Sequence, residues 1–175
     1  MHEIYLPETK PALEWVNNRV LQKVSPKRKH ALAQGRCVGA LDAWAQTFAC
    51  GMAGTEWHFQ VQPPGEISRT LVPDVAYLSY ARMPKADMER TEIPRMAPDA
   101  VVEICSPEDA QRDIDEKVRV YLAAGTAVVF LVDPQKRAVT VIDARGSTVL
   151  DDENVISHAT LPGFSMPART LFDLP

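Results

Sequence analysis

Three charged residues stand where the sequence is otherwise apolar. Asp74 interrupts the run 71–78, and Glu103 interrupts the β-branched run 99–105. An unpaired carboxylate in such surroundings is costly to remove from water, so each acid needs a partner. Lys117 falls inside the apolar stripe of the helix expected after Glu103, at about 100° per residue. A buried ion pair or a lysine that reaches solvent would explain either Glu103 or Lys117 alone, but their presence in one strand–turn–helix unit indicates a functional site.

Two carboxylates on neighbouring strands can share a hard divalent cation through oxygen ligands. Mg²⁺ commonly binds one or two carboxylates together with water and substrate phosphate, so we expect Asp74 and Glu103 to hold Mg²⁺ or Mn²⁺. A nearby ammonium such as that of Lys117 can orient an attacking water and stabilise charge on a phosphate in the transition state. This combination predicts hydrolysis of phosphodiester bonds.

Hydrophobic periodicity predicts the strands and helices that position these residues. The stretch Asp99–Cys105 predicts a strand, and the next segment predicts a helix with Ser106 as N-cap and Gly125 as its stop. The continuous apolar run 128–132 predicts a buried strand, with 138–143 as its antiparallel neighbour. Residues 147–175 predict short edge strands and turns.

The first half of the chain predicts a hairpin, a long helix and two strands. The hairpin pairs 13–16 with 19–24 around Asn17-Asn18, a dipeptide that tolerates the positive φ angles of a tight turn. Strands are expected over Trp57–Val61 and Leu71–Leu78. The segment 82–96 is either a loop that covers a substrate or an ordinary surface connection. A helix is expected over 26–49, with a core side formed by Leu32, Val38, Leu41, Ala45 and Phe48.

Length and composition indicate one globular domain over residues 1–175, with a core at about 13–143 and peripheral strands and turns over 144–175. The net charge of -4 argues against a protein that binds nucleic acid through a generally basic surface. The segment Lys23–His30 is the one clear basic cluster, and it is more typical of a solvated helix start than of a binding site.

Three cysteines without a CxxC spacing argue against a disulfide framework or a zinc ribbon, and they fit a reducing cytoplasm. The N-terminal segment has acidic residues and early prolines instead of a basic start and an apolar core, so no signal peptide is expected. The longest apolar run is far shorter than the ~20 residues of a membrane helix. A cytoplasmic protein without a membrane partner is therefore predicted.

The sequence resembles the PD-(D/E)XK nuclease superfamily at these residues. Pro73-Asp74 matches the first half of the pattern, and Glu103 matches the acidic position of the second half, whereas Cys105 stands where the lysine should be. The stretch PDAVVEICSP, Lys117 on the next helix and the later FLVDP resemble the Uma-type restriction endonucleases, in which a helix supplies the lysine. The resemblance extends from about residue 13 to 172.

This resemblance implies an α/β fold, with a mixed sheet, an αβββαβ core, an N-terminal hairpin and extra C-terminal strands. It also implies a metal-dependent endonuclease in which Asp74, Glu103 and Lys117 are catalytic. The expected substrate is nucleic acid, most simply DNA, and a homodimer is expected by analogy with superfamily members that cut both strands. Further candidate site residues are Glu14, His30, Asp99 and Asp113, of which His30 can equally be a residue at a helix end. Asp99 and Asp113 share faces with Glu103 and Lys117 and fit supporting roles better than catalysis.

Two other functions remain open from the sequence. The first is a catalytically silent module that keeps the fold and binds nucleic acid or assembles with a partner. The second is a different metal-dependent hydrolase, because fold analogy does not fix the substrate. The choice between DNA and RNA is also open.

Overall fold

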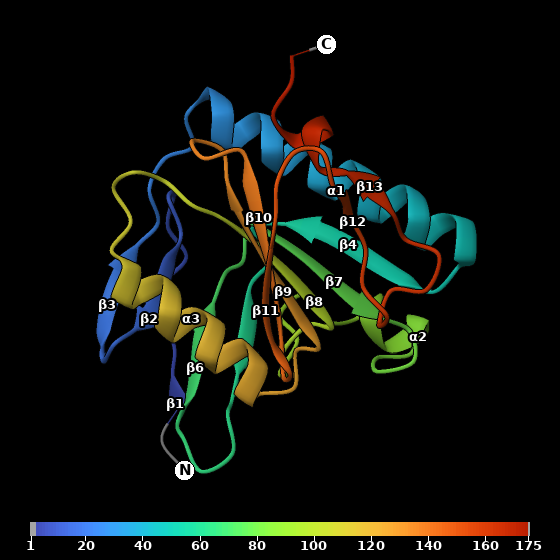
Figure 1. The fold of residues 1–175 in the computed structure, drawn as a ribbon. Coiled ribbons are helices and arrows are strands. Elements are labelled where there is room, and N and C mark those ends of the chain that lie inside the picture. The colour runs from blue at the N-terminus through green and yellow to red at the C-terminus, as the bar shows by residue number, and fades with distance from the viewer. Residues whose placement is uncertain (1–2, 175) are drawn as a thin grey trace.

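A six-stranded mixed sheet forms the centre of the protein in a computed structural model, which describes residues 3–174 (Figure 1). The chain is therefore of the expected α/β type. Only β8 and β9 pair in parallel, and the other neighbours in this sheet are antiparallel. In spatial order the strands are β11 (Gly146–Leu150), β10 (Ala138–Asp143), β9 (Val128–Asp133), β8 (Ala100–Ile104), β7 (Val75–Ser79) and β4 (Gly51–Thr55).

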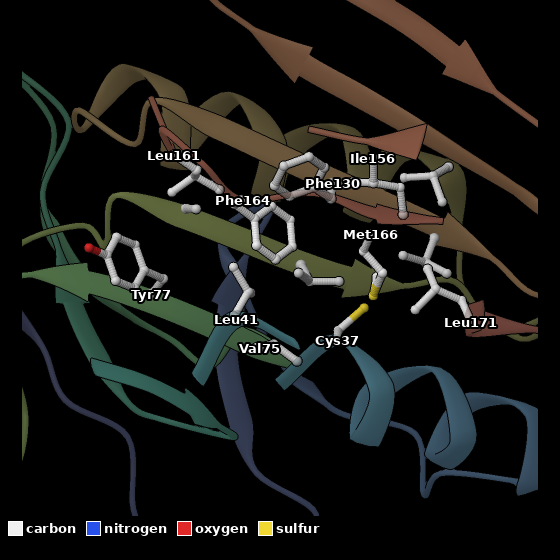
Figure 2. Packing of buried hydrophobic residues seen from close by; sticks show 14 of the residues in the cluster. Cys37, Leu41, Val75, Tyr77, Phe130, Ile156, Leu161, Phe164, Met166 and Leu171 are labelled. Carbon is white, nitrogen blue, oxygen red and sulfur yellow. The ribbon is translucent and has the colours of Figure 1, made fainter. Parts of the chain in front are cut away.

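Helix α1 (Arg28–Phe48) and the C-terminal segment cover one face of the sheet. Trp44 of α1 packs edge-on against Tyr77 of β7, with ring centroids 5.0 Å apart. Figure 2 shows side chains of the sheet, of α1 and of the C-terminal segment meeting in this core. The C-terminal segment contributes the core residues Ile156, Leu161, Phe164, Met166 and Leu171 from β12 (Val155–Ile156), β13 (Met166–Pro167), the short 3₁₀ helix η1 (Ala168–Leu171) and their connections.

Helix α3 (Gln111–Ala123) connects the parallel strands β8 and β9 and covers the opposite face. A second core lies here, and Tyr121 of α3 is fully buried in it. Successive residues of a strand point to opposite faces, so Val102 enters the first core and Val101 the second. Glu103 must therefore point towards α3. This side also carries α2 (Lys85–Met88), a small sheet of β1 (Glu3–Ile4), β6 (Ser68–Leu71) and β5 (Phe59–Val61), and an N-terminal hairpin.

The expected hairpin is confirmed, with β2 (Leu13–Val16) paired antiparallel to β3 (Arg19–Gln22). Asn17 and Asn18 have φ angles of 50° and 58°, the left-handed conformation that the sequence predicted for this turn. Three further expectations are also confirmed: the strand within 99–105, the strand 128–132, and its antiparallel partner 138–143.

The prediction of one strand over 71–78 is wrong. The segment contains the end of β6, a break at 72–74 and then β7, and the two strands belong to different sheets. Pro73 has no N–H to donate to a sheet ladder, which explains why a central strand cannot run through it. The break places the Asp74 carboxylate where it accepts a hydrogen bond from the Ile104 N–H, at 2.7 Å.

The start of α3 was predicted too early. Residues 106–109 form a turn in which the Asp109 carboxylate accepts the N–H of Ser106 at 2.7 Å, so Ser106 is not the N-cap. The helix begins at Gln111 and ends before Gly125, whose φ of 103° confirms its role as the stop.

Other expectations were incomplete. The helix over 26–49 exists, but its core side is formed by Ala33, Cys37, Leu41, Trp44 and Ala45, whereas Phe48 is 57% exposed. The strand expected over 57–61 is shorter, because β5 covers only 59–61, and the segment 82–96 contains α2. The sequence did not predict strand β4, since its residues GMAGT have the composition of a turn.

The three cysteines are free, as expected. Within residues 3–174 no helix is long and apolar enough to cross a bilayer.

Candidate active site

One pocket of about 300 Å³ brings together the residues that the sequence singled out for chemistry. It lies between the hairpin β2–β3, the start of α1, the turn that follows β8 and the first turns of α3. Asp74, Glu103 and Lys117 all line it, together with the additional candidates Glu14, His30 and Asp113.

Lys117 connects two carboxylates inside this pocket. Its Nζ lies 2.6 Å from Glu103 Oε2 and 3.0 Å from Glu14 Oε2, so the lysine joins α3 to both β8 and β2. The other oxygen of Glu14 accepts the N–H of Val72 at 2.8 Å. The hydroxyl of Tyr121 donates to Glu103 Oε1 at 3.3 Å. Burial alone would lower the pKa of Lys117, but Glu103 and Glu14 outweigh it and raise the pKa, so the side chain is an ammonium.

Asp74 is held by a second lysine. Lys23, just beyond β3, places Nζ 2.7 Å from Asp74 Oδ1, and His30 of α1 places Nε2 3.3 Å from Oδ2. Burial would raise the pKa of Asp74, but Lys23 and the hydrogen bond from His30 outweigh it and hold the pKa well below its usual range. Asp74 is therefore an anion that faces both a lysine and a histidine. The Nδ1 atom of His30 is buried without a hydrogen-bond partner among the described residues.

The pKa of Glu103 shifts in the opposite direction from that of Asp74. Burial raises its pKa to about 8, since the attraction of Lys117 is opposed by the neighbouring carboxylates Asp74 and Glu14. Four buried carboxylates, Glu14, Asp74, Glu103 and Asp113, line the pocket, and among them Glu103 can keep a proton at neutral pH. A carboxyl with such a raised pKa in a pocket is typical of functional sites.

The remaining sequence candidates have different positions. Asp113 accepts hydrogen bonds from Asn17 Nδ2 at 2.8 Å and from Arg19 at 2.6 Å, and so it fastens the hairpin tip to α3. Asp99 lies at the other end of β8 and accepts the N–H of Ser79 at 2.7 Å, outside the pocket lining. Cys105 lines the pocket, and burial raises the pKa of its thiol to about 11, so it stays protonated at neutral pH.

Lys23 is the functional candidate that the sequence analysis missed. It was counted only as part of an exposed basic cluster, although its side chain is about one-tenth exposed. The signal was its position on the hairpin: β3 pairs with β2 so that Leu13 faces Gln22, which puts Lys23 beside the strand that carries Glu14. Its backbone N–H also bonds the carbonyl of Ala12 at 2.9 Å.

The donor atoms in the pocket suit a hard divalent cation in kind. Carboxylate oxygens are the ligands that Mg²⁺ prefers, and a bound cation would displace the proton that burial favours on Glu103. Among residues 3–174, however, no three His, Cys, Asp or Glu side chains are grouped so as to hold a metal ion by themselves. A cation at Asp74 and Glu103 would therefore complete its coordination with water or substrate oxygens, as Mg²⁺ commonly does.

The fold and this site define the class of protein. The mixed sheet is of the restriction-endonuclease type. It places Asp74 before the central strand β7 and Glu103 on the next strand, β8, and the helix that follows carries the buried Lys117. Among solved structures, the chain is similar to one described as a putative nuclease belonging to DUF820 from Anabaena variabilis ATCC 29413. The TM-score is 0.84, the sequence identity 25%, and the match covers 95% of this chain and 93% of that one.

The family follows from the sequence match. Residues 2–169 match the model of the Uma2 family, described as a putative restriction endonuclease. The chain belongs to this family, as the residues around Glu103 and Lys117 predicted. No curated protein matches the chain. The family and the fold are those of nucleases, which act on phosphodiester bonds.

Proposed function

We propose that the protein is a metal-dependent endonuclease that hydrolyses phosphodiester bonds in DNA. The observation that carries the proposal is the convergence of Asp74, Glu103 and Lys117 from three different elements in one pocket. Their burial removes water from the charges, which strengthens their effect on a reacting phosphate.

Each residue has a role that its surroundings support. Asp74 and Glu103 would hold Mg²⁺ or Mn²⁺, which supplies charge neutralisation at the scissile phosphate when bound. Lys117 keeps its ammonium between two carboxylates, where it can orient a water or stabilise developing charge on phosphate oxygens. Glu14 holds Lys117 in place. Glu103, with a pKa of about 8, can also exchange a proton near neutral pH.

A catalytically silent nucleic-acid-binding module is the second candidate. The ammonium of Lys23 already lies 2.7 Å from Asp74, so a protein cation takes up part of the position proposed for the metal. A protein whose Lys23 permanently neutralises Asp74 would keep the fold and the pocket without cutting. This candidate differs from the first in one observable, the appearance of cleavage products when metal is present.

Cleavage of DNA with and without metal tests the proposal. Single-stranded and duplex DNA are incubated with the protein in Mg²⁺, in Mn²⁺ and in EDTA. We expect products that appear with metal and disappear with EDTA. Binding without products, across these metals and a range of pH, would favour the silent module.

The cellular setting and the oligomeric state belong to the same proposal. Three free cysteines suit a reducing cytoplasm. Nucleases of this superfamily that cut both strands often work as symmetric pairs, so we propose a homodimer by analogy. Light scattering of the purified protein measures the mass of the particle and decides between one copy and two.

A further inference from the structure

The reacting groups lie at the bottom of a small pocket. The exposed fractions of Glu14, Asp74, Glu103 and Lys117 are only 1%, 2%, 8% and 8%. A volume of about 300 Å³ is at the lower end for ligand pockets, which span roughly 300–1,000 Å³. A phosphodiester must therefore move into the protein to reach these groups, because they are not presented on an open surface.

Both walls of the pocket are fastened by side chains. On one side, Asp113 of α3 holds the hairpin through Asn17 and Arg19, and Asn17 Nδ2 also donates to the carbonyl of Arg112 at 3.1 Å. On the other side, Lys27 before α1 forms an ion pair with Glu108 in the turn after β8, but both side chains are exposed, so this contact holds its wall only weakly. The hairpin wall is therefore the one that limits how far the pocket can widen for a rigid ligand.

The charge around the pocket does not suit a duplex. Its lining includes six carboxylates and three cationic side chains, and the basic residues Lys27, Arg28 and Lys29 lie only at the start of α1. Duplex DNA carries one charge per ~1.7 Å of its axis and needs a broad basic surface, whereas one strand carries a charge per ~3.4 Å. An unpaired strand can also bend its backbone and turn single nucleotides into a pocket.

We propose that this pocket accepts an unpaired DNA strand in preference to a base-paired duplex. The inference rests on the proposed nuclease function for its chemistry, but its content is the shape and charge of the pocket. Duplex DNA would then be a substrate where its strands separate, at frayed ends or single-stranded tails. Selectivity comes from the hairpin wall, because its contacts with Asp113 limit the opening of the pocket.

Binding and cleavage measured on matched DNA separate the two proposals. A short labelled oligonucleotide is used alone, annealed to its full complement, or annealed to a shorter complement that leaves a tail, with Ca²⁺ for binding and Mn²⁺ for cleavage. We expect the single strand and the tailed duplex to bind about tenfold or more tightly than the full duplex. Tighter binding of the single strand without cleavage keeps this inference and overturns the nuclease proposal. Equal or tighter binding of the full duplex, or no binding of either, overturns the inference.

A hairpin variant tests whether the walls cause the selectivity. Asn17→Gly with Arg19→Gln removes both side chains that hold Asp113, while glycine keeps the positive φ of residue 17. The matched control is Arg145→Gln, which removes an exposed arginine paired with Asp143 between β10 and β11. We expect the ratio of duplex to single-strand dissociation constants to fall several-fold in the hairpin variant and to stay unchanged in the control. A ratio that stays the same in a folded hairpin variant, as judged by thermal melting, overturns the proposal.

Discussion

The ammonium of Lys117 lies 2.6 Å from a carboxylate oxygen of Glu103, and this contact joins α3 to the strand β8 that precedes it. Glu14 from the hairpin approaches the same ammonium at 3.0 Å. Such a contact is either a structural pair or a group held in place for chemistry. The burial of a further carboxylate, Asp74, in the same pocket favours the second interpretation.

The first prediction concerns metal binding. Millimolar Mg²⁺ or Mn²⁺ should raise the melting temperature of the wild-type protein, because a cation that binds only the folded state stabilises it by mass action. Asp74→Asn and Glu103→Gln should each abolish this rise, although the amide oxygen that Asp74→Asn introduces can still accept the N–H of Ile104. Differential scanning fluorimetry measures the effect, and Asp87→Asn on the exposed α2 is the control. A wild-type protein that shows no rise in either metal removes the main support for the metal site.

The pH dependence of stability provides a second prediction, for the protein in EDTA. The pKa of Glu103 is raised to about 8 by burial, above the ~4.3 of an unfolded chain. Between these values the folded state binds a proton that the unfolded state does not, so this residue makes the free energy of unfolding fall as pH rises from about 5 to 8. Urea unfolding of wild type and Glu103→Gln at several pH values measures the contribution. Parallel pH profiles for the two proteins would show that Glu103 does not titrate in this range.

The fastening of the hairpin gives a third prediction. Asp113→Ala removes the acceptor for Asn17 and Arg19 and should lower the free energy of unfolding by about 1–3 kcal/mol. Cleavage should fall further than stability explains, because the hairpin carries Glu14 and leads into Lys23. Urea unfolding and cleavage rates on the same preparation separate the two effects. A variant that is destabilised but cuts at the wild-type rate would show that the fastening serves stability alone.

Two glycines provide a paired test of the fold. A Cβ at Gly51 of β4 would lie 2.5 Å from the carbonyl oxygen of Leu78 and 2.6 Å from the ring of Tyr77, so Gly51→Ala should destabilise the protein by about 1–3 kcal/mol. A Cβ at Gly39 of α1 meets nothing within 4 Å, so Gly39→Ala should stabilise the helix by about 0.5–1 kcal/mol. Thermal melts of both variants check the opposite signs. A neutral Gly51→Ala would contradict the close packing of β4 on β7.

The sequence predicted the elements whose residues agree with their surroundings. The strand and helix around Glu103 and Lys117 and the Asn17-Asn18 hairpin combine clear periodicity with clear turn chemistry, and all were found. Strand β4 was missed because its five residues include two glycines, and it is a strand only because it pairs with β7. The break at Pro73 was also missed, since apolar residues on both sides obscured it.

The sequence predicted that Asp74, Glu103 and Lys117 belong to the candidate site, but it predicted fewer of the residues that contact them. Asp74 and Glu103 were visible as charges in apolar runs, which is a local signal. Lys23 had the hairpin register as its only sequence signal, because its burial also depends on Asp74, 51 residues later in the chain. Contacts of such long sequence separation leave no periodic pattern in the residues themselves.

The most direct test of the account is Lys117→Met, studied by urea unfolding and by DNA cleavage on one preparation. Methionine keeps an unbranched chain and good helix propensity while removing the charge and the donors. Burial raises the pKa of Glu103 to about 8 even beside Lys117, so the carboxyl can stay protonated at neutral pH once the lysine is lost, and metal can neutralise it when it ionises. In the presence of Mg²⁺ we therefore expect little change in the free energy of unfolding and a fall in cleavage rate of about 10²-fold or more. A purely structural ion pair would instead cost about 3–5 kcal/mol, and a stable, metal-binding Lys117→Met that cuts at the wild-type rate would remove Lys117 from the mechanism.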